Sequence, residues 1–303
     1  MSPSLEANAV FRVDGMVAVI TGGGTGIGLI MARALAANGA AKVYILGRRL
    51  EVLENAAKEN PDVFVPIRCD VTSKDSLQAA VDRVTAEAGF VNLFVANSGI
   101  LGPLNKWNPS KSVSEVRREL FTDNSMEAMT EVFHVNVTGA FFSMVAFLEL
   151  LDAGNKNAVE KGGFGAPTKA GSNVPSVQSQ VIVTASIAAF SRMNVSTAPY
   201  SGSKAAIMHL TKHASTNMAV YGIRANALAP GLFPSELAAS LIGTRNPAEE
   251  TYQDPKFIPA RKFGGDEEMA GTVLYLASRA GSFCNGMVLA ADGGRMSVMT
   301  TTY

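Results

Sequence analysis

The stretch VITGGGTGIG, residues 19–28, decides the fold, because it joins an apolar run to a helix candidate through a glycine-rich turn. MVAVIT (16–21) precedes the turn, and GLIMARALAANG (28–39) follows it. Gly22, Gly26 and Gly28 let the backbone approach a pyrophosphate closely, and the free N–H groups at the helix N-terminus then face the phosphate. The context predicts a dinucleotide-binding strand–turn–helix; an ordinary flexible turn is the alternative.

Similar apolar runs recur along the rest of the chain and alternate with helix candidates such as residues 73–89 and 266–279. The runs are rich in Val, Ile and Ala and lack polar alternation, which is typical of a parallel sheet covered on both faces. They are residues 42–46, 63–69, 92–97, 180–186, 223–230 and 286–292. We therefore expect one α/β domain over residues 1–303, a doubly wound parallel sheet of the Rossmann type.

Three stretches depart from this alternation. Residues 1–12 form an N-terminal extension, and residues 101–131 begin rich in Gly and Pro and become charged. Residues 152–179 are rich in Gly, Ser, Asn and Pro, which predicts a long flexible surface loop before a strand.

Composition excludes several classes of protein. Lys plus Arg and Asp plus Glu number 26 each, so no basic surface suggests binding to nucleic acid or to an anionic membrane. Cys69 and Cys284 are far apart with no CxxC spacing, which argues against a disulfide framework or a zinc site. The N-terminus lacks the pattern of a secretory signal, and no window of 18 residues is apolar throughout. A cytoplasmic protein is the resulting expectation.

Tyr200 and Lys204 stand four residues apart in the helix-like stretch TAPYSGSKAAIMHL (197–210) and so share one helix face. A tyrosine has a pKa of about 10, and a nearby ammonium group lowers it by stabilising the phenolate. The pair is therefore a candidate acid–base device. His209 and His213 share the same spacing, but no third ligand accompanies them, so no metal site is expected. No GxSxG motif suggests a serine hydrolase.

The glycine turn has the spacing TGxxxGxG rather than GxGxxG, and further segments follow it in a fixed order. They are ANSG (96–99), HVNVTG (134–139), VTASIAAF (183–190), YSGSK (200–204), APG (229–231) and ADGG (291–294). Together they resemble the landmarks of the short-chain dehydrogenase/reductase family, over residues 16–294.

The resemblance implies four catalytic residues: Asn136, Ser186, Tyr200 and Lys204. Tyr200 would exchange the proton while the nicotinamide carries the hydride, and Lys204 would also hydrogen-bond the nicotinamide ribose. Ser186 would hold the substrate oxygen, with Ser191 as a rival donor. Asn136 would hold a water molecule that links the lysine to solvent. Taken alone, each of these residues could equally be an ordinary structural group.

The cofactor preference rests on the residues that follow the run 42–46. An NAD site usually has an acidic residue about 20 residues after the glycine turn. Here Gly47 stands near that place, and Arg48 and Arg49 follow it. A guanidinium group suits a 2′-phosphate, so we expect NADP(H). One arginine could instead cap the following helix, and Thr25 stands where many NADP-preferring relatives carry a basic residue.

Further cofactor contacts are implied by the resemblance. Asp70 would meet the adenine amino group, although it could equally be a turn carboxylate or a helix cap. Asn97 and Ile100 lie where the adenosine half would bind, and Asn97 could equally join two strands. The complete set of expected cofactor contacts is Gly22, Thr25, Gly26, Ile27, Gly28, Arg48, Arg49, Asp70, Val71, Asn97, Gly99, Tyr200, Lys204, Pro230, Gly231 and Phe233.

Residues 232–262 resemble the substrate lid of the family. Its four prolines prevent one long helix, and its apolar inner face would consist of Phe233, Leu237, Leu241 and Ile242. Ser235 would lie near the nicotinamide carboxamide. GLFPSEL (231–237) most resembles 3-oxoacyl-carrier-protein reductases and allied ketoreductases of secondary metabolism.

The expected function is the reversible, NADPH-dependent reduction of a ketone to a secondary alcohol. An NAD(H)-linked alcohol dehydrogenase and a dinucleotide-binding sensor without chemistry are the rival interpretations. The substrate would be a small carbonyl or alcohol compound. The resemblance also implies a homodimer or homotetramer that forms through the two helices carrying Asn136 and Tyr200.

Overall fold

A seven-stranded sheet forms the centre of the computed structural model, which describes residues 5–194 and 196–302. Every neighbouring pair of strands is parallel, in the order β3-β2-β1-β4-β5-β6-β7. The strands are β1 (Val17–Thr21), β2 (Lys42–Gly47), β3 (Phe64–Arg68), β4 (Leu93–Ala96), β5 (Gln180–Thr184), β6 (Arg224–Pro230) and β7 (Val288–Ala291). The expected doubly wound α/β fold is confirmed, with each strand inside its expected apolar run or within one residue of it.

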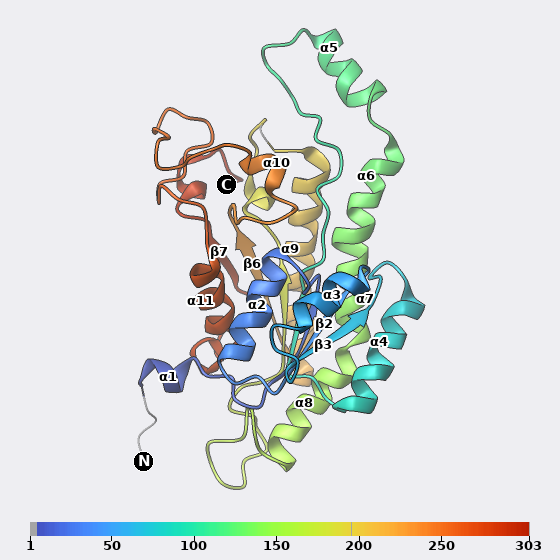
Figure 1. Cartoon of the computed structure of the whole chain (residues 1–303), viewed down its shortest axis with the longest axis vertical. Helices are drawn as coiled ribbons and strands as arrows, with labels where there is room; N and C mark the ends of the chain where they lie inside the picture. Colours follow the sequence, from blue (N-terminus) through green and yellow to red (C-terminus); the bar gives the residue numbers. More distant parts are fainter. Residues whose placement is uncertain (1–4, 195, 303) are drawn as a thin grey trace.

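Helices cover both faces of the sheet, because successive residues of each strand point to opposite sides (Figure 1). Ala18 and Ile20 of β1 share a core with α2 (Gly26–Ala37), α3 (Leu50–Ala57) and α11 (Asp266–Ala277). Val17 and Val19 share the other core with α4 (Lys74–Glu87), α7 (Ala140–Ala146) and α9 (Ala198–Met218). The chain moves outward from β1 in one direction to β3 and in the other from β4 to β7, so the strand order reverses between β1 and β4. Such a reversal opens a crevice at the carboxyl ends of the strands.

The helix that leads into the second core changes its winding. Helix α6 (Met126–Phe133) passes into a π-helical turn (His134–Gly139) and then into α7. A π-helical turn inside an α-helix is rare and is frequently found at functional sites. The expected active-site residue Asn136 lies in this turn and is buried.

The prediction of a flexible loop over residues 152–179 is wrong for the first third of that stretch. Helix α8 (Leu148–Glu160) continues through this stretch, with Gly154 and Ala158 buried. A Cβ atom on Gly154 would come within 2.2 Å of the Val91 carbonyl oxygen, so glycine here permits close helix packing rather than a loop. The later residues are also anchored, because Oδ1 of Asn155 accepts a hydrogen bond from the backbone N–H of Ser179 at 2.8 Å.

Three other segments lie outside the sheet and the helices that cover it. Helix α5 (Val113–Arg117), within the irregular stretch 101–131, stands apart from the body of the protein (Figure 1). The expected lid, residues 232–262, contains one short helix, α10 (Ala239–Ile242), and otherwise turns. Of the expected N-terminal extension, residues 1–4 lie outside the described residues, and α1 (Ala7–Val10) is a single helical turn.

Among the described residues, no single helix is long and apolar enough to cross a membrane. The helical stretches Met126–Ala146 and Leu148–Glu160 reach that length and composition only as a pair, which is bent by 42°.

Candidate active site

A cavity of about 540 Å³ lies where the strand order reverses. Its walls come from the glycine turn, the ends of β2, β4, β5 and β6, the start of α9 and the segment that follows β6. Of the residues expected from the sequence to bind cofactor or to take part in catalysis, all but two line it: Gly22, Thr25, Gly26, Ile27, Arg48, Arg49, Asp70, Val71, Asn97, Gly99, Ser186, Tyr200, Lys204, Pro230, Gly231 and Phe233. The two exceptions, Gly28 and Asn136, lie behind the wall.

The glycine turn has the backbone geometry that its sequence predicts. Gly22 and Gly26 have positive φ angles of 65° and 51°, which residues other than glycine rarely adopt. Gly28 serves packing instead: a Cβ atom there would lie 2.2 Å from the Gly22 carbonyl oxygen. Helix α2 can therefore begin directly beneath the turn and direct its N-terminus at the cavity.

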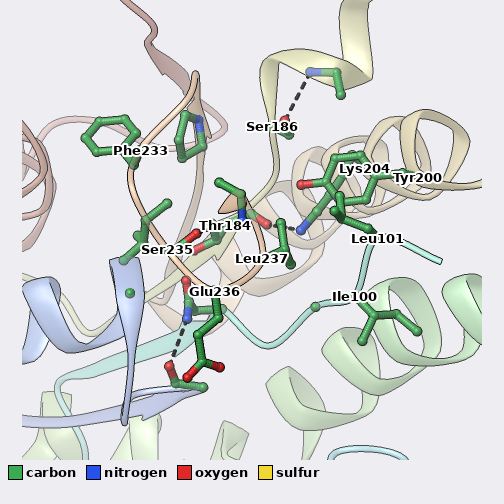
Figure 2. Close-up of a pocket in the computed structure, with 18 of the residues that line it drawn as sticks. Ile100, Leu101, Thr184, Ser186, Tyr200, Lys204, Phe233, Ser235, Glu236 and Leu237 are labelled. Atoms are coloured by element: carbon green, nitrogen blue, oxygen red, sulfur yellow. Dashed lines mark hydrogen bonds between the residues drawn. The ribbon is translucent and has the colours of Figure 1, made fainter. Parts of the chain in front are cut away.

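Tyr200 and Lys204 lie together on α9 and face the cavity (Figure 2). The Lys204 ammonium nitrogen is 5.7 Å from the centre of the Tyr200 ring and donates a 2.7 Å hydrogen bond to the Thr184 carbonyl at the end of β5. The side chain is only 4% exposed, and this burial lowers the pKa of Lys204 to about 8. The amine is thus held in place and close to its own titration near neutral pH.

The pKa of Tyr200 differs from the expectation. Burial raises it, and the interaction of the phenol with the Ser186 hydroxyl opposes that rise. The expected lowering by Lys204 is not found in the chain alone. Its ammonium group is directed at the Thr184 carbonyl, and burial disfavours its charged form. Tyr200 is therefore a protonated phenol at neutral pH.

Ser186 lies two residues beyond the end of β5, at the start of a short 3-10 turn (Ile187–Phe190). Its Oγ accepts a 3.1 Å hydrogen bond from the Ala188 N–H, which fixes the side chain next to Tyr200. The rival Ser191 also lines the cavity, but its Oγ is held by the Ser196 hydroxyl at 2.8 Å and the Met193 N–H at 3.3 Å. Ser186 is thus the serine that interacts with the phenol.

Asn136 connects the segment after β4 to α9. Its Nδ2 donates to the Ile100 carbonyl at 2.9 Å and to the Ser203 hydroxyl at 3.0 Å, and its Oδ1 accepts from the Ile100 N–H at 2.8 Å. A Cβ atom on Gly99 would lie 3.1 Å from Asn136 Oδ1 and 3.5 Å from Lys204 Nζ, so the amide and the ammonium group are neighbours across this glycine. Both amide N–H groups are occupied by the protein.

Asp70 and Asn97 both form hydrogen bonds within the protein, as the structural interpretation of each residue predicts. Oδ1 of Asp70 accepts hydrogen bonds from the N–H and the hydroxyl of Thr72, and these bonds, more than the charge of Arg48, lower the pKa of Asp70. Asn97 Nδ2 donates to the Thr21 carbonyl at 3.1 Å and so ties β4 to β1. Both residues also line the cavity.

The end of β2 presents two arginines to the cavity, Arg48 and Arg49. Arg49 forms an ion pair with Glu236 of the segment after β6, at 2.7 Å. Both side chains are more than half exposed, so this pair is weak. β2 ends at Gly47, so the position at which an NAD site usually has an acidic residue carries no carboxylate that would repel a phosphate.

The expected lid residues divide into two groups. Leu237, Leu241 and Ser235 line the cavity, whereas Ile242 is not among its described lining residues. Phe233 lines it but is 3% exposed and packs against Gly264, where a Cβ atom would come within 2.4 Å of the ring. Figure 2 shows the segment with Phe233, Ser235, Glu236 and Leu237 around the cavity.

Sequence reasoning missed further cavity-lining cations: Lys106, Arg245, Lys256 and Arg295. They come from three separate segments and share no linear motif. In total, the charged residues that line the cavity comprise seven cations and three carboxylates, in a chain whose formal net charge is zero. A glycine turn with positive φ and a cationic lining fit a polyanionic dinucleotide.

No group of three or more His, Cys, Asp or Glu side chains among residues 5–194 and 196–302 is arranged to hold a metal ion. His213 contacts Asn217 on the exposed side of α9.

Comparisons with known proteins agree with this geometry. Residues 22–296 match a family model described as "Enoyl-(Acyl carrier protein) reductase". The chain is 59% identical over 273 residues to the short-chain dehydrogenase/reductase SAT3 of Stachybotrys chartarum, covering 90% of this chain and 100% of that protein. It is 44% identical to the short-chain dehydrogenase/reductase PhomF of Diaporthe leptostromiformis, covering 100% and 99%. A crystal structure of a short-chain type dehydrogenase/reductase from Mycobacterium marinum superposes with a TM-score of 0.74 at 29% identity, covering 94% and 97%.

Proposed function

The chain belongs to the short-chain dehydrogenase/reductase family, and from this premise we propose that it reduces a ketone to a secondary alcohol with NADPH. One observation carries the proposal: the half-buried Tyr200 and the buried Lys204 lie together in the wall of the same cavity that the glycine turn lines. A cofactor held at the turn and a carbonyl held at the phenol would therefore meet in one enclosed space.

Bound NADPH would supply the hydride; the chain's own side chains handle the substrate oxygen. The Ser186 hydroxyl donates a hydrogen bond to that oxygen and stabilises the charge that develops on it. Tyr200 gives its proton to the same oxygen. The raised pKa of Tyr200 suits the reductive direction, because the phenol stays protonated at neutral pH until the oxygen becomes basic.

Lys204 and Asn136 would act around the phenol rather than on the carbonyl. Lys204 stabilises the phenolate that remains after proton transfer and is held in position by the Thr184 carbonyl. Asn136 fixes the segment Gly99–Ile100 against α9 and so keeps the space in front of Lys204 constant.

The preference for NADPH over NADH rests on Arg48 and Arg49 beside Gly47. Two guanidinium groups and no adjacent carboxylate favour a ribose that carries a 2′-phosphate. The ion pair of Arg49 with Glu236 is exposed, so a phosphate can displace the carboxylate at a cost below about 1 kcal/mol.

The helices that carry Asn136 and Tyr200 would also join copies of the chain into a dimer or tetramer. Large apolar side chains on α6 and α7 are exposed in the single chain: Met126, Met129, Phe142 and Val145. Light scattering on the eluted protein tests this assembly, and Phe142→Lys should shift it toward the monomer.

A panel of ketones tests the function, with NADPH and NADH compared for the wild type and Tyr200→Phe. We expect higher kcat/KM with NADPH and a loss of about 10²–10⁴-fold in Tyr200→Phe, with NADPH binding retained. Equal kcat/KM with both cofactors would contradict the Arg48 and Arg49 argument. Binding of NADPH without any Tyr200-dependent turnover would instead favour a sensor.

A further inference from the structure

Four cations line the cavity apart from the glycine turn and the end of β2: Lys106, Arg245, Lys256 and Arg295. Their interactions show that they form one group in space. The charges of Lys256 and Lys106 repel each other, as do those of Arg245 and Arg295, and Arg245 donates a hydrogen bond to the backbone carbonyl of Lys256. The two arginines and the two lysines have different surroundings.

The arginines hold the backbone that presents Lys256. Arg295 donates to the carbonyl oxygens of Pro255 and Phe257, and Arg245 donates to the carbonyl of Lys256 at 2.8 Å. Arg245 is itself fixed by two hydrogen bonds to Glu250, of 2.7 and 3.0 Å. Three successive carbonyls are thus tied to guanidinium groups, and Lys256 projects from a rigid segment.

The two lysines lack counter-ions among the described residues. Within the described part of the chain, no carboxylate forms a salt bridge with Lys106 or Lys256. Asp292, a carboxylate that lines the same cavity, accepts hydrogen bonds from the N–H groups of Gly294 at 3.0 Å and Met296 at 2.7 Å, so both of its oxygens have backbone partners.

The absence of a counter-ion has an electrostatic cost. Partial burial, together with the charge of Lys256, lowers the pKa of Lys106. Two ammonium groups that repel each other at the wall of a cavity are stabilised by any anion that binds between them. Leu101, Leu104 and Leu241 line the same cavity, so an apolar body with an anionic end suits this lining.

We propose that Lys106 and Lys256 bind an anionic group of the ketone substrate, a carboxylate or a phosphate, at a position other than the carbonyl that is reduced. The inference rests on the proposed function and deepens it by naming the substrate class. A carboxylate would belong to a free keto acid, and a phosphate to the phosphopantetheine arm of a thioester.

Matched pairs of substrates test the proposal with NADPH at saturation. One pair is 4-acetylbenzoate and its methyl ester; the other is acetoacetyl-CoA and S-acetoacetyl-N-acetylcysteamine, which lacks phosphates. For the wild type we expect higher kcat/KM for the anionic member of at least one pair. In Lys106→Gln/Lys256→Gln that ratio should fall about tenfold, and high salt should lower it in the wild type. The pair that responds identifies the anion.

Lys161→Gln/Lys169→Gln is the control, because both lysines are exposed between α8 and β5 and their loss changes the net charge as much as the double variant does. It should leave both ratios unchanged. Ratios that stay the same in the double variant, or a rise in the KM for NADPH in place of a fall in the ratio, would overturn the proposal.

A binding measurement separates this proposal from the proposed function. Titration calorimetry of 4-acetylbenzoate and of acetoacetyl-CoA into the NADP⁺-loaded protein needs no turnover. A Kd about tenfold weaker in the double variant than in the wild type, for either probe, supports the anion site even if no ketone is reduced. Equal Kd values, or no binding of either probe to the wild type, would overturn it.

Discussion

Arg49, just before helix α3, donates a 2.7 Å hydrogen bond to Glu236, 187 residues later on the segment that follows β6. Ser235 lies beside this pair in sequence and packs against Gly26, where a Cβ atom would come within 2.9 Å of the serine Cβ. The expected lid therefore contacts both the glycine turn, at Gly26, and Arg49 after the end of β2. If the cofactor binds at the turn as we propose, these two contacts would link its binding to the position of this segment.

Glu236→Gln should lower the KM for NADPH about two- to fivefold. The substitution releases Arg49 and removes one of the three carboxylates of a cavity that must accept phosphates. Steady-state kinetics with NADPH as the varied substrate measures the effect. Glu249→Gln in the same segment lies outside the cavity lining and is the control. An unchanged or higher KM in Glu236→Gln would show that the pair does not compete with the cofactor.

The sequence predicts most of the fold because its signals are local. Strands buried on both faces have continuous apolar runs, and the glycine turn and the Tyr200–Lys204 pair lie within short stretches. Helix α8 was not predicted, because its Gly and Asn residues are common in loops and its stability comes from packing against Val91 and Ser179. The prediction that Lys204 lowers the pKa of Tyr200 was wrong for a similar reason. Burial raises this pKa, and burial depends on the whole fold.

The missed part of the site consists of contacts between distant segments. Lys106 follows β4, Lys256 lies in the expected lid and Arg295 lies near the C-terminus, so no spacing in the sequence relates them. The same holds for Arg49 and Glu236. Such groups become visible only when the fold brings their segments to one cavity.

Gly28→Ala should destabilise the protein by about 1–3 kcal/mol, because the new methyl group would lie 2.2 Å from the Gly22 carbonyl oxygen and 2.6 Å from Asn97 Nδ2. Gly271→Ala in α11 is the matched change, with no atom within 4 Å of the new Cβ. It should stabilise the protein by about 0.5–1 kcal/mol, since alanine favours the helix. Thermal unfolding should therefore move in opposite directions for the two variants. An unchanged or higher Tm in Gly28→Ala would contradict the packing role of Gly28.

Asn136→Ala should lower the free energy of unfolding by roughly 2–4 kcal/mol, because the N–H and C=O of Ile100 lose their side-chain partner. It should also lower kcat, since Gly99 and Lys204 lose a fixed neighbour. Ser203→Ala removes one hydrogen bond to the same amide and should cost about 1 kcal/mol, with a smaller loss of kcat. Chemical denaturation and kinetics on both variants measure these effects. Wild-type stability in Asn136→Ala would exclude the proposed anchoring role.

Lys204→Met should inactivate the enzyme yet stabilise the fold at neutral pH. Burial lowers the pKa of Lys204 from its ordinary 10.5 to about 8, so below pH 8 the folded protein holds a charge at a cost of about 3 kcal/mol. The lost hydrogen bond to Thr184 offsets about 1 kcal/mol, which leaves a gain of about 2 kcal/mol at pH 7.

The sign of the pH dependence distinguishes this charge effect from a change in packing. Between about pH 8 and 10.5 the unfolded chain binds more protons at Lys204 than the folded protein does, so the wild type gains stability as the pH rises through that range. Lys204→Met lacks this gain, and its advantage should disappear by about pH 10. Lys212→Met, on the exposed side of the same helix, should follow the wild type at every pH. Denaturant unfolding at pH 7, 8.5 and 10 tests the prediction, and a difference that does not vary with pH would mean that Lys204 contributes no desolvation penalty.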